Sequence, residues 1–124
     1  MKWFGSLKEQ KTAKLAANDA DHYTDCVEIV KKLKADGNFD EAIPILIKAI
    51  DQTENESRKM GKGWGVAPWY YEQLAIIYRK MKNFQAEIDI LERYKKQEKA
   101  PGIGPSKLAA RLIKARELLE KVSS

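Results

Sequence analysis

The chain has little of what disulfide-rich and membrane proteins depend on. It holds one cysteine, Cys26, in 124 residues, so no disulfide framework can form and a reducing compartment is the simplest expectation. No stretch approaches the ~18–20 consecutive apolar residues that cross a bilayer. Residues 1–8 also lack the apolar segment of a secretory signal. We therefore expect a cytoplasmic protein with no membrane partner.

Histidine is equally scarce, which limits the chemistry that the chain can offer. His22 lies near Asp19, Asp21 and Asp25, but a metal site needs several convergent ligands, and so local a cluster is common by chance. Cys26 falls on an apolar stripe, which predicts a buried thiol and not a nucleophile. No phosphate-binding loop, carboxylate pair or hydrolase motif appears. We expect no catalytic site, no metal and no cofactor.

Glycine and proline are few, and several of them gather in two stretches. Residues 57–67 hold three glycines within five residues and predict a loop, which carries Trp64. Residues 100–105, Ala-Pro-Gly-Ile-Gly-Pro, predict a second break. Elsewhere apolar residues recur at steps of three and four, as they do along one face of a helix. This pattern predicts an all-α fold in a single domain over residues 1–124.

The helices that this pattern predicts cover residues 7–17, 20–35, 39–56, 68–81, 84–98 and 106–122. Ser6 and Glu9 have the spacing of a capping box for the first helix, which we expect to be peripheral. Pro68 and Ser106 suit the starts of two later helices. Pro44 lies near a helix start, where it forfeits few hydrogen bonds. The short turns at 36–38 and 82–83 favour antiparallel neighbours.

A repeat links the two short turns. Asp36-Gly37-Asn38-Phe39 aligns with Met81-Lys82-Asn83-Phe84 at an offset of 45 residues. The same offset aligns apolar positions in the flanking helices, so that residues 20–56 correspond to residues 68–99. A unit of two helices cannot bury its own apolar faces, and consecutive units are therefore expected to stack.

Two segments resemble the tetratricopeptide repeat. They are Tyr71-x2-Leu74-Ala75-x2-Tyr78, which matches its first helix, and Gly37-x-Phe39-x2-Ala42-x3-Leu46, which matches its second. The resemblance covers about residues 23–99 and implies two helix-turn-helix units followed by a capping helix over 106–122. Cys26, Val30 and Glu87 depart from the pattern, and the period is 11 residues too long. A helical bundle without a true repeat is the alternative.

This resemblance implies a groove lined by the first helix of each pair. Partner-binding positions are then expected at Lys31, Lys34, Trp69, Gln73, Ile76 and Arg79, with Lys107, Arg111 and Lys114 added by the last helix. Trp64 either folds back into this groove or waits for a partner, and Trp69 is either an anchor or a lid on the core. Solvated surface is the alternative interpretation of the lysines.

The positive charge of the chain is unevenly distributed along the sequence. Residues 1–66 carry eleven basic and eleven acidic side chains, whereas residues 67–124 carry twelve basic and seven acidic ones. The whole excess of +5 therefore lies in the second half. The sequence predicts a non-enzymatic interaction module or scaffold that binds an acidic peptide or partner protein in a basic groove.

Two alternatives stay open. The segment Pro101–Ser106 is similar to the hairpin of helix-hairpin-helix modules, where glycine amides approach a nucleic-acid phosphate. Residues 93–121 hold nine basic and three acidic side chains, although Leu108 stands where that family has a small residue. Self-association into a homodimer is the other alternative, because a short array leaves an open end.

Overall fold

The computed structural model describes residues 23–61 and 64–123, which fall into two compact units that meet within one helix, after Gln52. The expected peripheral helix at 7–17 and the lone His22 lie outside the described residues. Every regular element of the described part is helical, and an isolated bridge between Val66 and Lys99 is its only strand-like pairing. The all-α class is confirmed.

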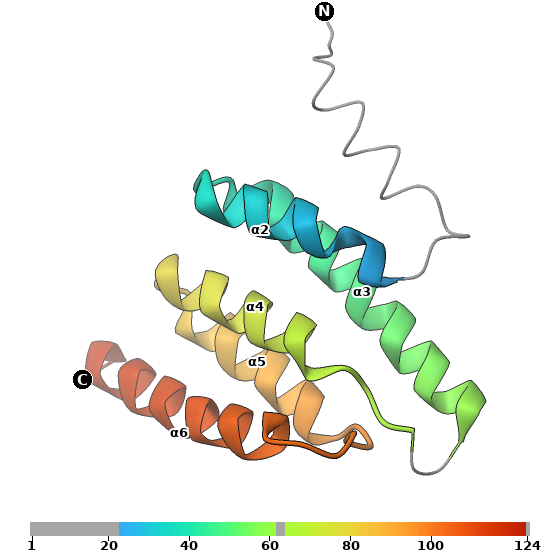
Figure 1. Ribbon diagram of the computed structural model, residues 1–124. Coiled ribbons are helices and arrows are strands. Elements are labelled where there is room, and N and C mark those ends of the chain that lie inside the picture. The colour runs from blue at the N-terminus through green and yellow to red at the C-terminus, as the bar shows by residue number, and fades with distance from the viewer. Residues whose placement is uncertain (1–22, 62–63, 124) are drawn as a thin grey trace, which may run out of the picture. The chain divides into compact units, whose positions relative to one another are not determined.

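The first unit contains a 3-10 turn, η1 (Tyr23–Cys26), then α2 (Val27–Ala35) and the start of α3 (Phe39–Met60) (Figure 1). Its buried side chains are Val30, Leu33, Ala42, Ile45, Leu46, Ala49 and Ile50. Pro44 is exposed inside α3, and the helix continues past it. It is the sixth residue of α3, so its missing N–H removes one hydrogen bond close to the helix start.

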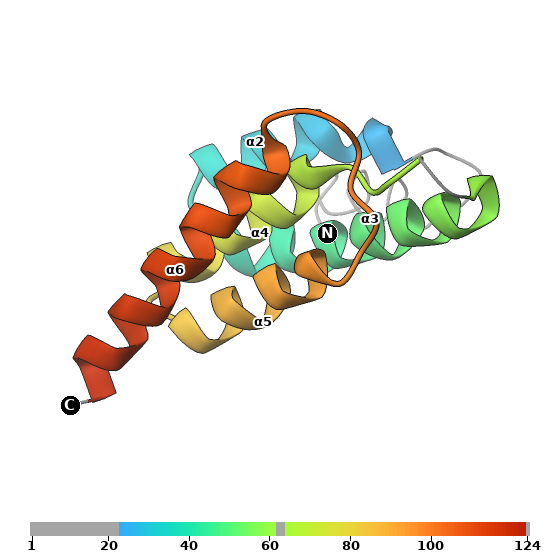
Figure 2. The same ribbon diagram turned by 90° about the horizontal axis from the view of Figure 1, so that it is seen from below.

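The second unit contains the rest of α3 from Thr53, together with α4 (Pro68–Lys80), α5 (Phe84–Lys95) and α6 (Gly104–Ser123). Helix α5 packs against both α4 and α6, and runs antiparallel to each (Figures 1 and 2). Helix α4 also contacts α6. The largest fully buried side chains are Tyr71, Leu74, Ile77, Leu91, Glu87, Val66 and Thr53.

The two short turns have the same hydrogen bonds. After α2 the N–H groups of Gly37 and Asn38 donate to the carbonyls of Lys34 and Leu33, at 3.1 and 2.8 Å. After α4 the N–H groups of Lys82 and Asn83 donate to the carbonyls of Arg79 and Tyr78, at 2.9 and 2.8 Å. Each of these four residues lies 45 positions after its counterpart in the first turn. Both are Schellman caps, and both place one residue in the left-handed region: Gly37 at φ +76° and Lys82 at φ +61°.

Several helix ends differ from the sequence predictions. Helix α2 begins at Val27, after the 3-10 turn, although the pattern predicted a helix from residue 20. Helix α3 continues through Met60, so residues 57–60 are helical and not loop; nothing breaks the helix before Gly61, whose φ of +84° ends it. Helix α6 begins at Gly104, and the Ser106 hydroxyl donates to the Ile103 carbonyl inside the first turn, so Ser106 is not the N-cap. Helix α5 ends at Lys95, three residues early.

Gly65 and Val66, at the end of the glycine-rich stretch, pack against the α5–α6 connection. A Cβ added to Gly65 would lie 2.2 Å from the Ala100 nitrogen, and its φ is +74°, so only glycine fits there. Next to it the Val66 N–H donates to the Glu98 carbonyl at 2.9 Å. The Ala67 N–H donates to the Thr53 hydroxyl at 3.0 Å, which joins the loop to α3 as well. No helix in the described part is long and apolar enough to cross a membrane.

Candidate interaction site

The predicted partner-binding residues are divided between the two units. Lys31 and Lys34 lie on α2 in the first unit, where Lys31 is exposed and pairs with Glu28 at 3.5 Å. All the others lie in the second unit. There α4 supplies Trp69, Gln73, Ile76 and Arg79, and α6 supplies Lys107, Arg111 and Lys114.

The uncharged members of the α4 set are largely covered. Gln73 is buried, and Trp69 and Ile76 are half-buried. The Trp69 ring meets the Tyr70 ring edge to face, with centroids 5.0 Å apart and an interplanar angle of 82°. Tyr70 is itself buried, so the half-buried Trp69 ring contacts a side chain of the core.

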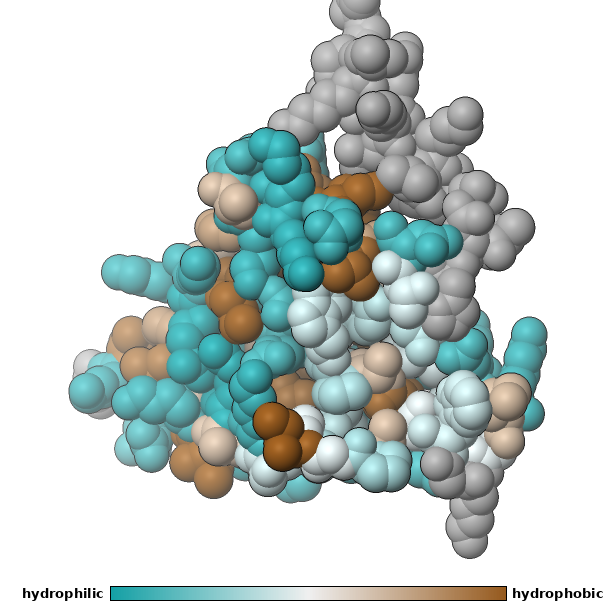
Figure 3. All heavy atoms as spheres, viewed as in Figure 1, coloured by the Kyte–Doolittle hydropathy of each residue, from teal (hydrophilic) through white to brown (hydrophobic). Residues whose placement is uncertain are grey.

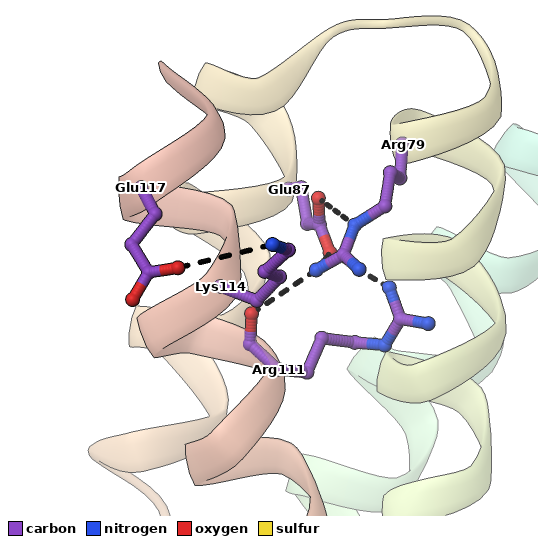
Figure 4. Close-up of polar contacts among 5 residues, drawn as sticks. All are labelled: Arg79, Glu87, Arg111, Lys114 and Glu117. Carbon is purple, nitrogen blue, oxygen red and sulfur yellow. Dashed lines mark hydrogen bonds and ion pairs between the residues drawn. The ribbon is translucent and has the colours of Figure 1, made fainter. Parts of the chain in front are cut away.

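The arginines converge on one buried carboxylate. Glu87, on α5, is 0% exposed and accepts hydrogen bonds from Arg79 Nε at 3.0 Å and from Arg111 Nη1 at 2.8 Å (Figure 4). Arg79 Nη2 lies 2.8 Å from the same carboxylate and also donates to the Arg111 carbonyl at 3.2 Å. The cluster therefore joins α4, α5 and α6.

This cluster carries one excess positive charge. A fully buried carboxylate is tolerated only when it is paired and hydrogen-bonded, and two guanidinium groups meet that need for Glu87. The Arg79 and Arg111 side chains remain 27% and 23% exposed. Glu87 thus neutralises one of the two charges and fixes both guanidinium groups at the surface of the unit.

Two lysines of α6 flank the arginines. Lys107 Nζ lies 2.8 Å from Glu72, and Lys114 Nζ lies 3.9 Å from Glu117 (Figure 4). Both lysine side chains are more than half exposed, although the Glu72 side chain is only 17% exposed; the Lys114–Glu117 pair is exposed on both sides, and such pairs are weak and screened by salt. They can exchange their carboxylates for others. We call Arg79, Lys107, Arg111 and Lys114 the cationic face.

A second buried carboxylate, which the sequence did not indicate, lies at the other end of α4. The Tyr71 hydroxyl donates to Glu54 Oε2 at 2.7 Å, and Arg93 donates to both oxygens of Glu54 at 2.8 and 2.9 Å. Burial, followed by the hydrogen bond to Glu54, raises the pKa of Tyr71 well above its usual range. These contacts join α3, α4 and α5, and we assign Glu54 a structural role.

An apolar groove lies on the opposite flank of α6, between α5 and α6. Its volume is about 210 Å³, its floor is formed by the buried side chains of Leu91, Tyr94, Leu108 and Leu112, and the exposed Ile113 lies above them. Lys95, Lys99 and Arg116 also line it. On the face that Figure 1 shows, hydrophobic residues reach the surface as small separate patches among hydrophilic ones (Figure 3). Burial, followed by the charge of Lys95, lowers the pKa of Lys99, whose Nζ lies 5.3 Å from the Tyr94 ring centroid.

Trp64 lies at the surface. It is 48% exposed, and its indole N–H donates to Glu56 Oε1 at 3.4 Å. In the Pro101–Ser106 segment, a Cβ on Gly104 would lie 2.7 Å from the Pro68 ring. Gly104 is therefore explained by the close approach of α6 to α4, without a phosphate.

The remaining candidate for chemistry is Cys26. Its thiol is partly buried, and burial, with a smaller effect of Asp25, raises its pKa to about 11, so it is protonated at neutral pH. Within the residues that the structure describes, no three histidine, cysteine or carboxylate side chains are grouped to hold a metal ion. Comparison of the chain with protein-family models, curated proteins and solved structures finds no match.

Proposed function

We propose that the chain is a non-enzymatic interaction module that binds an acidic protein segment on the cationic face. The observation that carries the proposal is the pair of guanidinium groups held by Glu87. Arg79 and Arg111 are fixed by hydrogen bonds, so a ligand carboxylate meets donors whose rotamers are already restricted. Glu87 and the Arg111 carbonyl occupy Arg79 Nε and Nη2 and Arg111 Nη1, so a ligand carboxylate would meet the other donors of the two groups, among them the Nε and Nη2 of Arg111.

Charge supports the same surface. The excess of basic side chains belongs to residues 67–124, and α6 alone carries Lys107, Arg111, Lys114, Arg116 and Lys121 against Glu117 and Glu120. Such a field attracts an acidic segment and speeds its association, most strongly at low salt. The resemblance to tetratricopeptide repeats agrees with this proposal, because the first helices of such pairs line the binding groove.

Binding of a labelled peptide of alternating glutamate and serine tests the proposal, by fluorescence anisotropy over a series of salt concentrations. The double variant Lys107→Gln with Lys114→Gln is expected to weaken binding by about tenfold, since two carboxylate contacts are lost. Lys80→Gln with Lys96→Gln is the matched control, because it removes the same charge from exposed positions outside the cationic face.

Two results would count against the proposal. Equal weakening by both double variants would show that only net charge matters. Tighter binding of a short DNA duplex, with a steep salt dependence that Lys107→Gln and Lys114→Gln reduce, would favour the nucleic-acid alternative.

A further inference from the structure

The flank of α6 that faces away from the cationic face has a different character. At 3.6 residues per turn, Leu108, Leu112 and Ala115 point to the core of the unit, and the lysines lie on one side of that line. Ala109, Ile113 and Arg116 lie on the other side, at the apolar groove. Ile113 is 60% exposed there, although the groove floor beneath it is buried.

We propose that the apolar groove between α5 and α6 is a docking site for an amphipathic helix of a partner protein, one that carries carboxylates beside its apolar stripe. The site is separate from the cationic face, and it goes beyond the function proposed above. Two antiparallel helices border it (Figure 2), and a third helix in such a groove is a common mode of peptide recognition.

The size of the groove favours side chains over a cofactor. Sites for small molecules usually enclose ~300–1,000 Å³, whereas this groove offers about 210 Å³. That volume suits one or two large apolar side chains, which would contact Leu91, Leu112 and Ile113. Burial of apolar area against such a floor stabilises a complex.

The charges at the groove select among partners. Lys95 and Arg116 are exposed, and Arg116 already pairs with Glu92. Carboxylates on the flank of a docked helix would complement these cations. A second copy of the groove would bring like charges together, and a nucleic acid would leave the apolar floor uncovered. An acidic amphipathic helix would cover the apolar floor with its apolar stripe and pair its carboxylates with Lys95 and Arg116.

The test uses the full chain, with methyl groups labelled for NMR, and an amphipathic peptide with leucines along one helical face and glutamates beside them. The expected result is a set of shift changes at the methyls of Leu91, Leu108, Leu112 and Ile113. Ile113→Glu is expected to weaken binding by at least about tenfold, because it places a charge on the contact. Ile103→Glu is the matched control, since Ile103 is 78% exposed and does not line the groove.

The outcomes separate the two proposals. Lys107→Gln with Lys114→Gln should leave leucine–glutamate peptide binding intact, and Ile113→Glu should leave glutamate–serine peptide binding intact. Absence of peptide binding would overturn the docking site, and so would shift changes away from the groove or equal weakening by Ile103→Glu. Equal binding of a leucine–lysine peptide, or self-association in sedimentation that Ile113→Glu abolishes, would overturn the stated partner.

Discussion

The helix pairs α2–α3 and α4–α5 have turns with the same hydrogen bonds, but they bury different side chains at corresponding positions. Ala42 and Glu87, which are 45 residues apart, are both 0% exposed. The alanine needs no partner, whereas the glutamate requires Arg79 from α4 and Arg111 from α6. The two pairs therefore have the same backbone cap, but the position that follows it is occupied by an apolar side chain in the first pair and by a charged one in the second.

The difference ties the second pair to α6. Arg111 reaches Glu87 from the third helix, so the cationic face exists only when α4, α5 and α6 are assembled. A buried ion pair is weak evidence for stability, because desolvation offsets much of its attraction. It does specify geometry, and here that geometry orients the donors that we propose for binding.

The largest expected effect comes from making the second pair like the first with Glu87→Ala. The substitution leaves two guanidinium groups without their carboxylate and should lower the free energy of unfolding by about 3 kcal/mol, measured with urea. Asp89→Ala removes an exposed carboxylate from the same helix and should change it little. Equal stability of the Glu87→Ala variant and the unchanged chain would contradict the role given to the cluster.

A smaller effect should distinguish two tyrosines of the second pair, which correspond to Cys26 and Ala49 in the first. Tyr71→Phe removes the donor to Glu54 and should cost about 1–2 kcal/mol of unfolding free energy. The buried Tyr94 hydroxyl has no hydrogen-bond partner in the described part of the chain, so Tyr94→Phe should be neutral or stabilising. Thermal unfolding checks both, and a larger loss for Tyr94→Phe would refute this assignment.

The shared cap predicts opposite effects from two substitutions at equivalent positions. Gly37→Ala places a side chain in the left-handed region and should cost about 1 kcal/mol. A Cβ there meets nothing within 4 Å, so the cost is backbone strain alone. Lys82→Gly relieves the same strain and should stabilise by about 0.5 kcal/mol, because greater freedom of the unfolded chain offsets part of the gain. Chemical denaturation of both variants tests the pair, and effects of the same sign would contradict the equivalence.

The last effect is absent at neutral pH and appears only under alkaline conditions. The folded-state pKa of Cys26 is raised from 9.0 to about 11, so its contribution to stability is complete below pH 9 and is lost as the pH rises toward about 11. Unfolding midpoints measured across this interval should fall, and Cys26→Ala should flatten the decline. The Tyr71 pKa is also raised, so Tyr71 adds a loss of the same sign above pH 10.

The sequence predicted the helices well because their apolar periodicity and turn residues are local signals. The two equivalent turns could be predicted from four residues each, 36–39 and 81–84, which both end in Asn-Phe. Helix ends were less predictable, because Ser106 has the composition of an N-cap but α6 begins earlier, at Gly104, which packs against Pro68. That contact joins residues 36 positions apart, and no local pattern encodes it.

The sequence predicted which residues belong to the candidate site, but it did not predict how they are arranged. Glu87 stood out as a departure from the repeat pattern, and Arg79 and Arg111 were expected to face a partner. Their convergence on Glu87 depends on the packing of three helices, which spacing alone does not give. The apolar groove was missed for the same reason, since Leu91 and Leu112 look like ordinary members of two separate helical stripes.

The central claim is that an acidic segment binds the cationic face of the second unit. Amide NMR spectra recorded during titration with the glutamate–serine peptide test it most directly. The account predicts shift changes at Arg79, Lys107, Arg111 and Lys114 and their neighbours, which weaken as salt is raised. Shift changes confined to residues 23–52, which include Lys31 and Lys34, would contradict it.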